Sequence, residues 1–149
     1  MAVKKVPKGY HAVTPYLVVN DAEKTIEFLE QAFGASLNYA LRRPDRSILH
    51  AELEIEDSRV MLAEAGEHHT AAPSMLYLYV DDVDAVYARA LKAGGTSAKE
   101  PVDEFFGDRT AGVKDPAGSH WEIATRKENL KPEELQKRAD EMFKKGKAA

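Results

Sequence analysis

Residues 14–36 read TPYLVVNDAEKTIEFLEQAFGAS, and residues 75–97 read MLYLYVDDVDAVYARALKAGGTS. These two stretches are each 23 residues long and lie 61 positions apart. They align without a gap and are identical at seven positions, among them Tyr16/Tyr77 and Gly34/Gly95. A repeat of this length, with capping residues and glycines at matching positions, indicates a duplicated structural module.

Both copies carry the same local signals for a strand followed by a helix. The strands YLVV and YLYV are rich in β-branched and aromatic residues, which favour extended structure. Acidic or amide residues at 20–21 and 81–82 follow, and these residue types cap helices. Apolar residues then recur at helical spacing, and glycines at Gly34 and at Gly94-Gly95 stand where a helix ends.

A longer β region follows each predicted helix. In the first copy, SILHAELEI and SRVMLAE flank Glu56-Asp57, a two-residue hairpin turn. In the second copy, RTAGVK and SHWEIAT flank the strong turn DPAG at residues 115–118. The sequence therefore predicts an α+β fold with two tandem βαβββ modules, at about 11–65 and about 73–126, within a single domain spanning residues 1–149. The segment AGEHHTAAP is the linker between the modules.

A third helix is predicted for the tail at about 130–145. The run Lys131-Pro132-Glu133-Glu134 places proline and acidic residues in a first helical turn, where both are favoured. The apolar stripe of this helix is modest. It is expected either to dock on the sheet or on a partner subunit, or to be a solvated helix that packs on its own domain.

Strand alternation divides the side chains between two faces of each predicted sheet. One face is apolar and is expected to lie against the helices. In the second hairpin we expect Lys114 to pair with Ser119, which places Arg109, His120 and Glu122 together on the other face. The apolar face of the first hairpin is expected to hold Leu49, Ala51, Leu53, Ile55, Val60 and Leu62.

We call the opposite side of each sheet, away from the helices, the mixed face. For an exposed surface it is unusually aromatic and carries few lysines. A concave, half-apolar surface with a few convergent polar groups is typical of a ligand pocket, and the alternative is that this face packs on another sheet. The predicted ligand-binding residues on it are Thr14, Tyr16, His50, Met75, Tyr77, Tyr79, Arg109 and His120, beside Glu52 and Glu122.

Four segments carry a resemblance to a known family, and they read TPYLVVND, LHAELEIEDSRVMLAE, LYLYVDDVDA and FFGDRTAGVKDPAGSHWEIAT. Together they resemble the vicinal oxygen chelate superfamily of glyoxalases, bleomycin-resistance proteins and extradiol dioxygenases. The resemblance covers about residues 11–126, and the tail is similar to that of uncharacterised glyoxalase-like members. It implies paired βαβββ modules whose mixed sheets curl around a cleft.

The resemblance also implies a place for a divalent metal, because enzymes of this superfamily commonly bind one through four strands. It maps those positions to Thr14, Glu52, Met75 and Glu122. The two glutamates suit a metal, whereas Thr14 and Met75 stand where the enzymes usually carry His or Gln. His50, two residues from Glu52, is a candidate third ligand. Since catalytic zinc usually needs three protein ligands, we expect no bound cofactor, with Zn, Ni, Mn or Fe as the alternative.

Three functions follow from this combination. The first is a small-molecule-binding protein of the glyoxalase/bleomycin-resistance type, with its ligand in the cleft between the sheets. The second is a metal-dependent lyase, isomerase or dioxygenase in which Glu52 or Glu122 is catalytic and shuttles a proton. The third is a dimeric structural or regulatory protein with a vestigial cleft. The resemblance implies a homodimer in each case.

Composition excludes several other classes of protein. The chain has 149 residues, no cysteine and a formal net charge of −4. The absence of cysteine excludes disulfides, thiol catalysis and Cys-ligated metal sites. A mildly acidic chain without a clustered basic face is not expected to bind nucleic acid. No apolar run approaches the ~18 residues of a membrane span and no signal peptide is evident, so we expect no membrane partner and a cytoplasmic location.

Overall fold

The computed structural model describes residues 2–146, and its first module is a four-stranded mixed sheet with one helix. In chain order its elements are β1 (Tyr16–Val19), α1 (Ala22–Phe33), β2 (Ser36–Arg42), β3 (Ile48–Ile55) and β4 (Ser58–Glu64). The strands lie in the order β1-β4-β3-β2, with β1 parallel to β4 and the other neighbours antiparallel. We call this sheet one.

The second module repeats this topology in sheet two. Its elements are β5 (Met75–Tyr79), α2 (Val83–Lys92), β6 (Thr96–Asp103), β7 (Asp108–Lys114) and β8 (His120–Arg126). The strand order is β5-β8-β7-β6. As in sheet one, the first two neighbours in this order, β5 and β8, are parallel and the other neighbours are antiparallel. The predicted α+β fold of two βαβββ modules is therefore confirmed, and neither sheet closes on itself.

The caps of the two helices explain why both modules begin in the same way. The Asp21 side chain accepts a hydrogen bond from the backbone N–H of Lys24 at 3.1 Å, and Asp82 accepts one from Ala85 at 3.2 Å. Each satisfies a backbone donor that the first turn leaves unpaired. Gly34 ends α1 with a φ of 68°, the left-handed conformation in which glycine is favoured.

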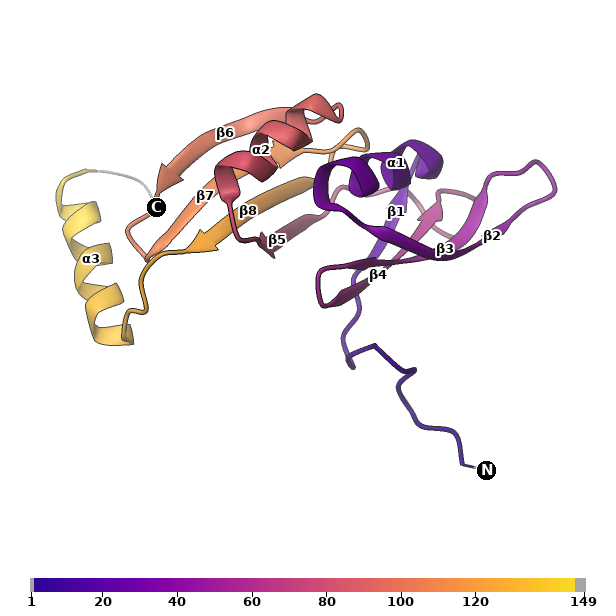
Figure 1. Ribbon diagram of the computed structural model, residues 1–149, viewed down its shortest axis with the longest axis horizontal. Helices are drawn as coiled ribbons and strands as arrows, with labels where there is room; N and C mark the ends of the chain where they lie inside the picture. The colour runs from indigo at the N-terminus through magenta and orange to yellow at the C-terminus, as the bar shows by residue number, and fades with distance from the viewer. Residues whose placement is uncertain (1, 147–149) are drawn as a thin grey trace.

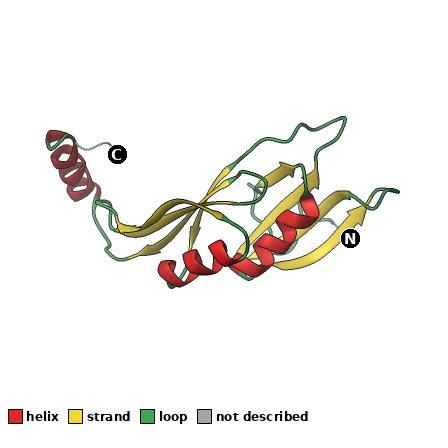
Figure 2. Cartoon of the chain, turned by 90° about the horizontal axis from the view of Figure 1, so that it is seen from above, coloured by secondary structure: helices red, strands yellow, loops and turns green. Residues whose placement is uncertain are grey.

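The two modules share one core. Helices α1 and α2 cover the same side of the two sheets (Figures 1 and 2), and the buried apolar residues of both modules form a single cluster. The ring of Phe33 from α1 lies 4.9 Å from that of Trp121 in β8. Arg89 Nε donates to the carbonyl of Ala32 at 3.0 Å. This packing leaves the mixed faces on the side away from both helices.

The expected position of Leu49 in the core was wrong. An irregularity in the pairing of β2 with β3 places Leu41 opposite His50 but Arg42 opposite Ile48, so Leu49 has no partner. An extra residue of this kind shifts the alternation of the strand. Ile48 is consequently 1% exposed in the core, whereas Leu49 is 48% exposed.

The expected register of the second hairpin was wrong by one residue. Lys114 pairs with His120 rather than with Ser119. The Asp115 side chain accepts hydrogen bonds from the backbone N–H of Ser119 and from that of Ala117, which draws Ser119 into the turn. Because side chains alternate along a strand, this shift moves Arg109 to the helix side of sheet two.

Helix α3 (Pro132–Lys144) lies at the outer end of sheet two, apart from α1 and α2 (Figure 1). The guanidinium of Arg138 joins it to the rest of the chain through Glu128 at 2.8 and 3.0 Å and through the carbonyl of Phe105 at 3.1 Å. No residue of α3 is buried, and Phe143 is largely exposed. Within residues 2–146, no helix has the length and apolar character needed to cross a bilayer.

Candidate functional site

Four tyrosine rings stand partly exposed on the mixed faces. Tyr16 and Tyr39 lie on sheet one, Tyr77 and Tyr79 lie on sheet two, and their exposure ranges from 43% to 56%. Alternation along the strands predicts this position for Tyr16, Tyr77 and Tyr79. Tyr39 was missed, although the alternation of LNYALRR contained the signal, since Tyr39 pairs with Glu52 across β2 and β3. Both sheets therefore offer aromatic surface on the same side.

Glu52 is the centre of the polar network on sheet one. Its carboxylate accepts hydrogen bonds from the hydroxyls of Tyr10 and Tyr39, and His50 Nε2 lies 2.9 Å from its Oε2 atom. The other ring nitrogen of His50, Nδ1, lies 3.1 Å from the hydroxyl of Tyr16. Tyr10 precedes the first strand, where no periodic pattern marks a residue as part of a site. Both oxygens of Glu52 are thus occupied by side chains of the protein.

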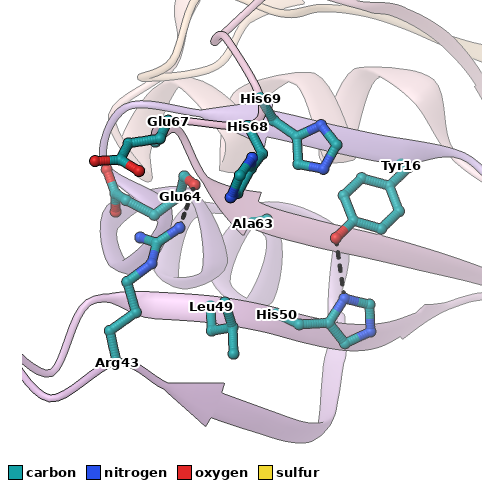
Figure 3. Close-up of a pocket in the computed structure, with 10 residues that line it drawn as sticks. Tyr16, Arg43, Leu49, His50, Ala63, Glu64, Glu67, His68 and His69 are labelled. Carbon is teal, nitrogen blue, oxygen red and sulfur yellow. Dashed lines mark hydrogen bonds between the residues drawn. The ribbon is translucent and has the colours of Figure 1, made fainter.

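A pocket of ≈ 620 Å³ lies beside this network on sheet one (Figure 3). Tyr16 and His50 line it, and Arg43, which follows β2, lines it as well. His68 and His69 of the linker also border it, and no motif in their local sequence predicts this. Its volume falls within the range of small-molecule sites, about 300–1,000 Å³.

Glu122 is the centre of a second network, on sheet two. Its Oε2 atom accepts a hydrogen bond from Lys99 Nζ at 2.5 Å, and His120 Nε2 lies 2.7 Å from its Oε1 atom. Lys99 also donates to Glu104 at 2.9 Å and to Thr110 at 2.7 Å. Lys99 was missed because it comes from β6, whose pairing with β7 is irregular.

These contacts determine the charges in the second network. Burial opposes ionisation of Glu122, but the hydrogen bonds from His120 and Lys99 outweigh it and hold the pKa of its carboxyl below the ordinary value. Burial likewise opposes the charge on Lys99, yet its bonds to Glu122 and Glu104 raise the pKa of the ammonium group. Glu122 and Lys99 therefore form an ion pair in this network.

Asp108 holds the two tyrosines of sheet two. Its Oδ2 atom accepts hydrogen bonds from the hydroxyls of Tyr77 at 2.7 Å and Tyr79 at 3.0 Å, and the aspartate is buried. Burial and this negative charge both raise the pKa of the Tyr77 phenol. Asp108 lies in the segment FFGDRTAGVKDPAGSHWEIAT quoted above, but its local sequence contains nothing that predicts a tyrosine partner.

Arg109 does not lie on the mixed face, which corrects its expected place beside Glu122. Its guanidinium contacts Asp84 of α2 at 2.8 and 3.0 Å and Asp103 of β6 at 3.2 Å. The shift in register described above is the cause. Arg109 therefore joins α2 to sheet two, on the side away from the tyrosines.

The model of one protein family, described as the glyoxalase/bleomycin resistance protein/dioxygenase superfamily, matches residues 10–123. The chain belongs to this superfamily. An uncharacterised protein of Mycobacterium bovis, Mb0911c, is 35% identical over 136 residues, which cover 84% of this chain and 90% of that relative.

Solved structures of two other proteins resemble this superfamily member in fold. TioX from Micromonospora sp. ML1 has a TM-score of 0.65 at 27% identity and covers 78% of this chain and 98% of its own. The hypothetical protein SA1046 from S. aureus has a TM-score of 0.60 at 25% identity, with coverages of 77% and 96%.

The side chains of this superfamily member do not fit the metal centre that the resemblance implied. Met75 is largely exposed, and the hydroxyl of Thr14 contacts the carbonyl of His11 at 3.4 Å. Glu52 and Glu122 belong to different sheets, and each is engaged in its own network. Among residues 2–146, no three His, Cys, Asp or Glu side chains gather in a way that could hold a metal ion.

Proposed function

We propose that this superfamily member binds a small molecule on its mixed faces. The observation that carries the proposal is the pocket of ≈ 620 Å³ on sheet one, beside the partly exposed ring of Tyr16. Aromatic side chains supply a large apolar contact area, and tyrosine hydroxyls can orient a ligand through hydrogen bonds. The bound molecule is accordingly expected to be planar or to contain a planar ring.

In this proposal Glu52 and Asp108 hold the tyrosine hydroxyls by hydrogen bonds and do not bind a metal. Glu52 accepts from Tyr39, and Asp108 accepts from Tyr77 and Tyr79. These bonds limit the rotation of the phenol rings before the ligand arrives. A surface whose side chains are already ordered loses less entropy on binding. His120 and Glu122 belong to the same face and would border a ligand that extends along sheet two.

A thermal-shift screen with planar compounds tests this function. A ligand is expected to raise the melting temperature of the wild-type protein. The rise should be lost in Tyr16→Ala for a ligand bound on sheet one, and in Tyr77→Ala for a ligand bound on sheet two. Tyr16→Phe is the matched control, because it keeps the ring and removes only the hydroxyl. If no compound shifts the melting temperature of the wild-type protein, binding at the mixed faces is contradicted.

Metal analysis separates this function from the metal-dependent lyase, isomerase or dioxygenase. Protein purified without chelator is expected to carry no stoichiometric Zn, Ni, Mn or Fe, because Lys99 contacts the carboxylate of Glu122. Stoichiometric metal that is lost in Glu122→Ala would contradict the binding-only function. It would instead favour a catalytic role for Glu122.

We propose further that two copies form a homodimer, as membership of the superfamily suggests. The mixed faces expose several large apolar side chains, and exposed apolar surface is typical of a region that contacts a partner. Light scattering at tens of micromolar should give twice the mass of the chain, and a monomeric mass would refute the dimer.

A dimer that binds no compound in the screen would favour the structural or regulatory alternative, in which the exposed apolar side chains of the mixed faces only contact the partner. The side chains concerned are Tyr16, Tyr39, Leu41, Met75, Tyr77 and Tyr79.

A further inference from the structure

We propose that the pocket on sheet one takes a small aromatic carboxylic acid, with its ring beside Tyr16 and its carboxylate on Arg43. This inference rests on the proposed function and names the class of ligand for that site. Three observations carry it (Figure 3). Within residues 2–146 the charge of Arg43 has no ion-pair partner, the lining near Tyr16 is aromatic and apolar, and the linker lies close to the guanidinium.

No carboxylate of residues 2–146 forms an ion pair with Arg43, although its charge adds to the hydrogen bonds from Ser47 in lowering the pKa of the nearby Asp45. Its guanidinium donates to the hydroxyl of Ser47 at 3.2 Å and to the backbone carbonyl of Glu64 at 3.1 Å, and both acceptors are neutral. The preceding residue, Arg42, is instead paired with Glu23 at 2.9 and 3.1 Å. Arg43 therefore has a permanent positive charge and further N–H donors for an anion.

The glutamates near this pocket do not take the place of such an anion. The carboxylate of Glu64 accepts the backbone N–H of Ala22 at 3.0 Å, at the first turn of α1, where a negative charge is favourable. Glu67 also lines the pocket but makes no ion pair with Arg43 in the described part of the chain. Its negative charge opposes an acidic ligand, and removing that charge should strengthen binding.

The other part of the pocket suits an aromatic ring. The ring of Tyr16 lies with its centroid 5.7 Å from that of His50 and 6.5 Å from that of His69. Leu49 and Ala63 add apolar surface to the lining. Leu49 is free to do so because the irregular pairing of β3 turned it out of the core. An aromatic ligand can stack or pack edge-on against such side chains.

The linker after β4 lies close against the guanidinium of Arg43. Gly66 donates its backbone N–H to the carbonyl of His69 at 3.0 Å, which forms a turn at the border of the pocket. A Cβ atom at Gly66 would lie 3.2 Å from Arg43 Nη2. The absence of a side chain at this position therefore lets the linker approach the guanidinium without displacing it.

Calorimetric titration with 1-naphthoate and its neutral amide, 1-naphthamide, tests the inference. The acid is expected to bind about tenfold more tightly than the amide, since a hydrogen bond to a charged group contributes enough for that ratio. In Arg43→Gln this preference should disappear, whereas Arg42→Gln, the matched control, should retain it. Glu67→Gln should raise the affinity for the acid and leave that for the amide unchanged.

The location of the ring is tested with the repeat-related tyrosines. Tyr16→Ala is expected to weaken binding of both probes about fivefold or more, and Tyr77→Ala, which changes the equivalent position of sheet two, should have no effect on them. Equal affinity for acid and amide in the wild-type protein, or a preference that survives Arg43→Gln, overturns the inference. Failure of 1-naphthoate to bind at millimolar concentration also overturns it. The proposed function still stands if another compound raises the melting temperature of the wild-type protein and this rise is lost in a tyrosine variant. It fails only if no compound behaves in this way.

Discussion

Lys99 Nζ lies 2.5 Å from Oε2 of Glu122, so the chain's own ammonium group neutralises the carboxylate that the family resemblance assigned to a metal. The same ammonium contacts Glu104 and Thr110, which hold it in place. A lysine in this position supplies positive charge without a metal. It also makes sheet two a pre-formed polar surface next to the tyrosines.

The first prediction concerns this ion pair. Lys99→Met should lower the free energy of unfolding at pH 7 by about 1–2 kcal/mol, a value reduced for the 37% exposure of the lysine side chain. The control Lys92→Met changes an exposed lysine of α2 and should have little effect. Urea unfolding monitored by circular dichroism measures both.

The pH dependence of the same variant gives an independent check. The pKa of Glu122 is lowered in the folded protein, so its contribution to stability is present above the ordinary carboxyl pKa of about 4.3. That contribution is lost as the pH falls through the lowered value. The gap between wild type and Lys99→Met should therefore narrow as the pH is lowered from 7 to about 3. A gap that stays constant would show that the lysine acts through packing alone.

The second prediction concerns Tyr77 and Asp108. The pKa of Tyr77 is raised by burial and by the aspartate, so its contribution to stability is full below the ordinary phenol pKa of about 10 and is lost as the pH rises above it. Asp108→Asn should lower that pKa and shift the alkaline tyrosinate absorbance curve toward lower pH. Asp84→Asn, on the helix side of sheet two, should leave the curve unchanged. Identical curves for wild type and Asp108→Asn would contradict the assignment.

The third prediction concerns the junction between the modules at Gly95. A Cβ atom there would lie 2.6 Å from Val113 Cγ1 and 3.0 Å from Phe28 Cε1 of the first module. Gly95→Ala should therefore lower the free energy of unfolding by about 1–3 kcal/mol, the usual cost of overfilling a core. Gly66→Ala, where only the flexible end of an arginine is near, should change it by about 0.5 kcal/mol or less. Equal effects of the two substitutions in denaturant unfolding would refute this.

The fourth prediction concerns the attachment of α3. Arg138→Ala removes the contacts with Glu128 and with the carbonyl of Phe105, so α3 should exchange its amide hydrogens faster and the segment before it should be cleaved sooner by protease. Amide exchange in sheet two should stay unchanged. Lys137→Ala, an exposed neighbour on the same helix, is the control. Unchanged exchange of α3 in Arg138→Ala would mean that other contacts hold the helix.

Local signals account for the parts of this fold that could be predicted. The helix caps Asp21 and Asp82 and the turn at Glu56 between β3 and β4 were predictable, because each depends only on residues within a few positions. The tail helix from Pro132 also followed from its own first turn. The repeat then implied that the second module copies the first.

The parts that could not be predicted depend on how strands meet. Leu49 left the core because β2 and β3 pair irregularly, and Arg109 changed face because the turn after β7 draws in Ser119. In both cases a shift of one residue moves a side chain across the sheet. The same limit applies to the contact between Lys99 in β6 and Glu122 in β8, because these two residues are 23 positions apart in the chain.

The sequence by itself thus determined two βαβββ modules, their helix caps and an aromatic face on each sheet, because periodicity and capping are local properties. Only the tertiary structure decided which polar groups meet: Lys99 with Glu122 and Asp108 with Tyr77. Within residues 2–146, Arg43 forms no ion pair with a carboxylate. Such pairings depend on register and on the approach of distant strands, for which no local pattern exists. They place Glu52 and Glu122, the two glutamates at the positions that the resemblance implied for a metal, in two separate networks with neighbouring side chains.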